Sequence, residues 1–170
     1  NNVSEEAAPV TTEKELQVGE QLAEMFGYAT DHGAEPCAWG HLTSGGTVAN
    51  YEALWNRRSV KFYALALQEG ARRRGFDPVV GPARKPLLSY GKWELLNLTV
   101  DQTIALRREM VRILQAEASR PEFHAFSQAV RSERIESLGT TGFVLKHRIK
   151  PPRVLVSASA HYSWAKGMKV

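Results

Sequence analysis

The stretch that decides how the chain is interpreted is His41-Leu42-Thr43-Ser44-Gly45-Gly46-Thr47-Val48-Ala49-Asn50-Tyr51-Glu52-Ala53-Leu54. It reads as a short apolar run, a glycine turn and the start of a helix, because its later apolar residues recur at helical spacing. Two adjacent glycines let the backbone turn sharply and approach a ligand closely. Free N–H groups at a helix start, with small hydroxyl side chains beside them, suit an anion such as phosphate. The same residues also fit an ordinary capped turn that binds nothing.

The composition is that of a globular protein. The chain has 170 residues, of which 43% are hydrophobic and 24% charged, so we expect one domain. The net charge is +4. The basic residues gather in short runs, and no nucleic-acid recognition motif accompanies them, so we expect a solvated face and no nucleic-acid partner. The runs are Arg57-Arg58, Arg72-Arg73-Arg74 and Lys146-His147-Arg148.

The single cysteine and the hydropathy bear on the compartment. Cys37 cannot form an internal disulfide and fits a reducing environment, so a cytoplasmic protein is expected. No apolar run approaches the roughly 20 residues needed to cross a bilayer, and the polar, acidic start at Asn1–Glu6 is unlike a signal peptide. We therefore expect no membrane association.

Helical and strand-like segments alternate along the chain, which predicts an α/β fold. Arg153–Ser157 is short, apolar and β-branched, as a buried parallel strand would be. In α/β sheets ligands bind beyond the carboxyl ends of the strands, so the glycine turn and His161 are expected to face one pocket. In chain order we first expect an extended segment 1–10, a helix opened by the capping box Thr12–Glu15 and running to Gly27, and a short strand or extended lead-in to the glycine turn at 37–42. A helix from Thr47 at least to Arg58 follows, with a second helical pattern to Arg74 and an irregular insertion at 75–91. The rest is a helix from the capping box Thr99–Gln102 to Ala118, a helix to Leu138 that opens with the N-cap Ser119 and with Glu122 three residues later, a break at 139–142, the strand, and a helix from His161.

Other kinds of site find little support. A zinc site needs about three or four ligands with paired spacing, and one cysteine with scattered histidines does not supply them, so no metal site is predicted. Ser44 does not stand in the pattern of a hydrolase nucleophile elbow.

Three stretches resemble the pyridoxal-phosphate (PLP)-dependent group II amino-acid decarboxylases, the family of the glutamate, aromatic amino-acid and tyrosine decarboxylases. They are Glu6–Glu13, the turn Thr43–Asn50, and Val154-Leu155-Val156-Ser157-Ala158-Ser159-Ala160-His161-Tyr162-Ser163-Trp164. The tyrosine decarboxylase branch is the most similar. The resemblance implies a partial large domain of the PLP-dependent transferase fold (fold type I, like aspartate aminotransferase), with an incomplete mixed or parallel sheet flanked by helices.

The resemblance also implies the site. Gly46 and Thr47 would bind the PLP phosphate, and His161 would stack on the cofactor ring as a catalytic residue. A PLP enzyme also needs a lysine that bonds the cofactor and an acidic partner for the ring nitrogen. In the family both lie downstream of the stacking histidine, and Lys166 and Lys169 do not stand in that lysine motif. Together with two ends that look cut, this predicts a fragment that is inactive by itself.

The family further implies an amino-acid substrate and a homodimer, with a segment like Asn1–Pro9 near the partner subunit's site. Tyrosine is favoured as the substrate, with other aromatic amino acids and glutamate left open. The alternatives are a non-catalytic domain that binds a phosphate-bearing ligand or a partner chain, and another PLP-dependent lyase of the same fold.

Overall fold

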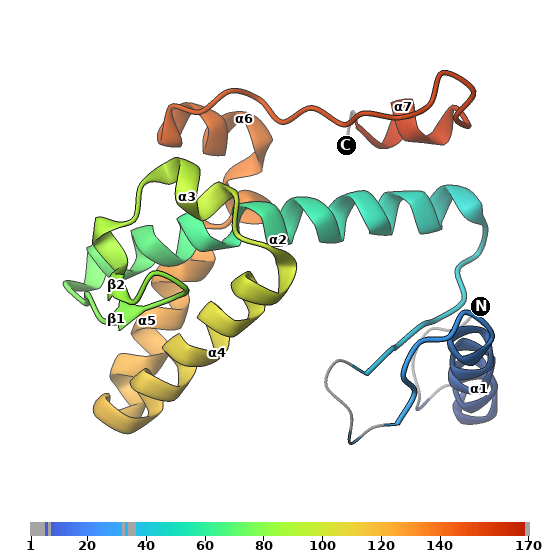
Figure 1. Cartoon of the computed structure of the whole chain (residues 1–170), viewed down its shortest axis with the longest axis horizontal. Coiled ribbons are helices and arrows are strands. Elements are labelled where there is room, and N and C mark those ends of the chain that lie inside the picture. The colour runs from blue at the N-terminus through green and yellow to red at the C-terminus, as the bar shows by residue number, and fades with distance from the viewer. Residues whose placement is uncertain (1–5, 7, 32, 34–36, 169–170) are drawn as a thin grey trace. The chain divides into compact units, whose positions relative to one another are not determined.

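The computed structural model describes residue 6, residues 8–31, residue 33 and residues 37–168. The chain forms two compact units, Asn1–Tyr51 and Glu52–Val170. In the described residues helices dominate, and the only sheet is a pair of two-residue strands (Figure 1).

The first unit is built on helix α1, Pro9–Met25. Pro9 occupies the first turn, where its missing N–H costs nothing and its fixed φ suits a helix. The predicted capping box is therefore wrong, because the helix begins before Thr12, whose hydroxyl instead donates to the Ala8 carbonyl at 3.1 Å. Pro9 and Val10 are helical rather than extended. Most of the predicted segment 1–8 lies outside the described residues.

Residues 37–42, predicted as a short strand or an extended lead-in to the glycine turn, form no strand and lead into the turn as irregular chain. They are nevertheless held against α1. The Leu42 N–H donates to Oε1 of Glu15 in α1 at 2.9 Å, and the Ala38 N–H donates to the carbonyl of Ala29, in the loop after α1, at 2.7 Å. Hydrogen bonds to α1 and to the loop that follows it thus take the place of the sheet pairing that a strand would need.

Helix α2, Gly46–Arg74, begins in the first unit and continues into the second. It is one helix of 29 residues where two helical stretches were expected. Its later residues, from Phe62 to Ala71, are largely buried, because other elements of the second unit cover this part of α2 on several sides. Because this part of α2 has apolar residues on every face, it lacks the one-sided apolar spacing by which a helix is recognised in a sequence. The sequence pattern therefore indicates two helical stretches in place of one helix.

The second unit packs around that part of α2. Its further helices are α3 (Lys92–Leu96), α4 (Val100–Glu117), α5 (Arg120–Glu133), α6 (Ile135–His147) and α7 (Ser163–Gly167). Figure 1 shows α3, α4, α5 and the hairpin gathered about the C-terminal half of α2. Their buried side chains form one cluster: Phe62, Ala64, Leu65, Leu67, Ala71, Val80, Leu87, Tyr90, Leu95, Leu106, Met110, Leu114, Phe126, Val130, Ile135 and Phe143.

Residues 75–91 were expected to be an irregular insertion, and they are more ordered than that. Strands β1 (Val79–Val80) and β2 (Lys85–Pro86) form an antiparallel hairpin, followed by the 3₁₀ helix η1, Leu87–Ser89. The buried Gln68 amide of α2 donates to the carbonyls of Leu87 at 3.0 Å and Tyr90 at 2.8 Å. These bonds satisfy buried backbone groups and tie the segment to the core.

The capping box predicted at Thr99–Gln102 and the helix cap predicted at Ser119 are confirmed. Thr99 and Gln102 cap α4, and Ser119 and Glu122 cap α5. The prediction that this helix reaches Leu138 is wrong, because α5 ends at Glu133. The next helix, α6, contains a kink at Gly139, whose φ is 69°. Glycine adopts this positive φ without strain, so the predicted break is a bend within α6.

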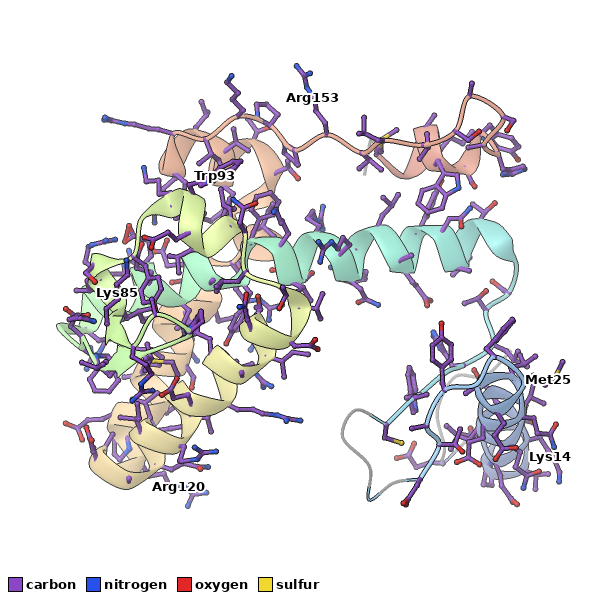
Figure 2. All side chains as sticks on the ribbon, in the orientation of Figure 1. Lys14, Met25, Lys85, Trp93, Arg120 and Arg153 are labelled. Atoms are coloured by element: carbon purple, nitrogen blue, oxygen red, sulfur yellow. The ribbon has the colours of Figure 1, made fainter. Side chains whose placement is uncertain are left out.

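The predicted buried parallel strand Arg153–Ser157 is not formed. The segment is an irregular, exposed chain, in which Leu155 is 95% exposed and Arg153 points away from the ribbon (Figure 2). The expected parallel sheet is thus absent from the described part of the chain, which is mostly helical. An apolar β-branched run forms a strand only when it pairs with another strand, and the strands of the described residues, β1 and β2, pair with each other and not with this segment. No helix in the described ranges is both long and apolar enough to span a bilayer.

Candidate functional site

The glycine turn ends in an N-terminal helix cap made by the backbone. The Gly45 carbonyl accepts hydrogen bonds from the N–H groups of Val48 at 3.0 Å and Ala49 at 3.2 Å. The Thr43 hydroxyl donates to the same carbonyl at 3.0 Å. These bonds leave the N–H groups of Gly46 and Thr47 at the helix start without an intrahelical acceptor.

The side-chain positions of the two glycines in the turn are open. A Cβ placed on Gly45 or Gly46 would meet no atom within 4 Å. Gly45 has a φ of 149°, which side-chain-bearing residues rarely adopt. An anion could therefore approach the N–H groups of Gly46 and Thr47 closely, with the helix dipole favouring its charge. These features fit a phosphate group.

The segment that leads into the turn is fixed by α1. Gly19 of α1 meets the backbone of Gly40 so closely that no side chain fits between them. Glu15 accepts a hydrogen bond from the Leu42 N–H, and the ring of Trp39 stacks on that of His41 with their centroids 5.1 Å apart. The position of the turn within the first unit thus depends on small residues and one carboxylate of α1.

His161 lies in the second unit, just before α7, and its side chain is exposed. Its Nδ1 lies 3.3 Å from the Ser163 N–H, which donates to it, and 2.9 Å from the Ser163 hydroxyl. Because a backbone N–H can only donate, Nδ1 acts as the acceptor, and the neutral ring carries its proton on Nε2. The buried Ser163 therefore sets both the tautomer and the orientation of the ring.

The neighbours of His161 add an aromatic face and a cation. The rings of His161 and Tyr162 lie 4.2 Å apart between centroids, and Nζ of Lys166 lies 4.7 Å from the centre of the Tyr162 ring. This cation–π contact gives Lys166 a partner within its own turn. Lys169 lies outside the described residues.

The predicted site residues fall in both units. Gly46 and Thr47 are adjacent at the start of α2, whereas His161 belongs to the second unit. The hydrogen bonds and contacts of the glycine turn lie within the first unit, and those of His161 lie within the second. That they face one pocket stays a prediction.

The sequence reading passed over two buried polar residues of the second unit. Glu133, at the end of α5, is 1% exposed and forms ion pairs with Arg73 and Lys146. His147, at the end of α6, is 4% exposed. Both stand in polar stretches of sequence, which predict solvent exposure, so only the fold reveals their burial. In the described residues no three His, Cys, Asp or Glu side chains are grouped as a metal site would need.

Comparison with known proteins gives relatives of one kind. No family model matches the chain, and no solved structure matches it significantly. An L-tyrosine decarboxylase of Levilactobacillus brevis is 28% identical over 172 residues, which cover 100% of this chain and 21% of that protein. L-tyrosine decarboxylases of Enterococcus faecalis (strain ATCC 700802 / V583) and Enterococcus faecium are each 29% identical, over 100% of this chain and 21% and 22% of their own lengths.

The chain thus spans about a fifth of the length of the curated relatives it matches. The matches extend beyond the three stretches on which the resemblance was based. The predicted resemblance to the tyrosine decarboxylase branch is confirmed: along its whole length this chain is similar to one part of the L-tyrosine decarboxylases.

Proposed function

We propose that this chain is part of a PLP-dependent amino-acid decarboxylase, in which it carries the phosphate-binding turn and the histidine that stacks on the cofactor. The observation that carries the proposal is the similarity to three L-tyrosine decarboxylases along the entire chain. The unpaired donors of the glycine turn support it independently, because they suit the phosphate of such a cofactor.

Gly46 and Thr47 have the binding role in this proposal. Their N–H groups would hold the phosphate, and the half-buried Thr47 side chain adds a hydroxyl donor beside them. Gly45 and Gly46 keep the approach free of side chains. When bound, PLP supplies an electron sink for cleavage of a bond at the substrate α-carbon.

His161 has the orienting and stacking role. Ser163 fixes its ring by hydrogen bonding at Nδ1, which leaves the Nε2 proton and the ring face opposite Tyr162 for the cofactor and substrate. An imidazole can also exchange a proton near neutral pH. The lysine and the acidic residue that PLP chemistry needs would come from parts of the protein outside this chain.

L-tyrosine is the first substrate to test, because the matched relatives are named for it. Other aromatic amino acids and glutamate are the next candidates. The product would be the corresponding amine with carbon dioxide. We further propose that the whole protein is a cytoplasmic homodimer.

The test is an assay of the whole protein with added PLP and, in separate reactions, L-tyrosine, L-phenylalanine, L-tryptophan and L-glutamate. The expected result is release of carbon dioxide and one matching amine, together with the absorbance band of protein-bound PLP. PLP binding with no amine from any amino acid, but with another lyase product, would favour a different PLP-dependent lyase. Binding of inorganic phosphate without PLP binding would favour a non-catalytic phosphate-binding domain.

A further inference from the structure

His147 is a buried imidazole at the C-terminal end of α6. It is 4% exposed, and its Nε2 has no hydrogen-bond partner among the described residues. Its ring packs on that of Phe143, one turn earlier, with the centroids 4.2 Å apart. Its backbone carbonyl accepts a hydrogen bond from Nζ of Lys92 in α3, at 2.7 Å. The same residue therefore contributes both to the core and to the contact between α6 and α3.

Charged groups from four elements surround this ring. Burial, followed by the charges of Lys146 and Lys92, lowers the pKa of His147 below its ordinary value of 6.5, and the charges of Glu69 and Glu133 act in the opposite direction. The carbonyl end of a helix also favours a cation. The net direction is downward, so the buried neutral ring is the preferred form.

Neither carboxylate is free to receive a protonated His147. Glu69 binds Arg72 through both oxygens, each at 2.7 Å. Glu133 binds Arg73 at 2.9 Å with one oxygen and Lys146 with the other. A buried imidazolium would have to break one of these pairs or move to water, and moving to water requires the last turn of α6 to open.

We propose that His147 is a proton-sensitive latch: in its neutral form it holds the C-terminal turn of α6 against α3 and the core, and protonation releases that turn. The turn is otherwise closed by Arg148 in the left-handed conformation and by Ile149, whose N–H donates to the Val144 carbonyl at 3.2 Å. The chain continues from this point to His161. Acidification would thus loosen the attachment of the segment that carries the stacking histidine.

The sign of the pH dependence follows from the proton balance. A histidine whose pKa is lower in the folded state binds fewer protons there than in the open state. Its stabilisation of the closed turn is complete above the ordinary pKa of 6.5 and is lost as the pH falls below it. With one proton linked to opening, the open population rises by up to about tenfold per pH unit within this window.

The test is hydrogen–deuterium exchange of the whole protein between pH 7.5 and 5.5, corrected for the intrinsic rate. Peptides covering residues 143–149 are compared with peptides of α4, Val100–Glu117. We expect protection of residues 143–149 to fall several-fold on acidification while α4 stays protected. His147→Leu, which keeps the site buried and uncharged, should abolish this fall. His124→Leu, at an exposed position of α5, should leave it unchanged.

A fall in protection that persists in His147→Leu would overturn the proposal, and so would constant protection in the unsubstituted protein. If His147→Leu does not fold, NMR titration of the histidine rings in the unsubstituted protein decides instead. The proposal expects the His147 ring to titrate below 6.5, together with shifts of the Phe143 ring. Titration at or above that value contradicts it.

Discussion

Gly19 and Gly40 are in backbone contact in the first unit: a Cβ placed on Gly19 would lie 2.5 Å from the Gly40 carbonyl oxygen. Glycine inside a helix ordinarily costs about 0.5–1 kcal/mol relative to alanine. Here it allows α1 to meet the segment that leads into the phosphate turn. The conformation of the turn thus depends on a residue that carries no functional group.

Gly19→Ala should therefore destabilise the first unit. The added methyl meets backbone, which cannot rotate away, so α1 and the chain at Gly40 must separate. Overpacking of this kind costs about 1–3 kcal/mol, which outweighs the gain in helix propensity. Hydrogen exchange of α1 in the whole protein measures the loss. Gly33→Ala is the control, because the nearest atoms that its Cβ would meet in the described residues belong to the Asp31 carboxylate, at 3.4 Å. Equal protection in the two variants would contradict the packing argument.

Gly46→Asp should weaken PLP binding markedly. The new carboxylate would stand at the helix start, where the phosphate is proposed to bind, and like charges repel there. Titration of the whole protein with PLP, followed by absorbance, gives the affinity. Ala53→Asp is a matched control, since it adds the same charge at an exposed position two turns further along α2. If Gly46→Asp binds PLP as tightly as Ala53→Asp, the phosphate lies elsewhere.

His161→Ala should lower the decarboxylation rate strongly and leave folding nearly intact. The side chain is exposed, so its removal costs little packing. A positioned histidine in a catalytic site is typically worth about a hundred-fold or more in rate. Turnover and thermal unfolding of the whole protein are measured together, with His124→Ala as the control at another exposed histidine. Unchanged turnover of His161→Ala would exclude the catalytic role.

The parts of the fold that were predicted correctly are those that depend on nearby residues. Thr99 and Ser119 cap their helices through side chains three residues away, so the sequence pattern is sufficient. The candidate turn likewise lies at the start of a helix, as its glycines and threonine indicate.

The parts that were missed depend on residues far away in the sequence. The hairpin at 79–86 owes its place to Gln68 and Tyr90, and prolines hid its pattern. Val154, Leu155 and Val156 have the composition of a buried strand, but in the described residues the strands β1 and β2 pair with each other and not with this segment. His147 was passed over because it stands between Lys146 and Arg148 in the sequence, whereas the fold buries it.

The two units should differ sharply in stability when residues 1–170 are produced alone. In the first unit the only buried positions among the described residues are Gly19 and Ala23, which is too little core to hold about fifty residues folded. The second unit has the large apolar cluster, but it also exposes Leu155 and its neighbours to water. We therefore expect broad, weakly cooperative unfolding, with fast amide exchange in α1 and slow exchange in α4. We also expect no amine from tyrosine or glutamate, because no lysine here stands in the family's cofactor-binding motif. One sharp unfolding transition with a protected α1 would contradict the argument from burial. Amine production by this chain would show that it supplies the cofactor-bonding lysine itself, with Lys166 the first residue to replace.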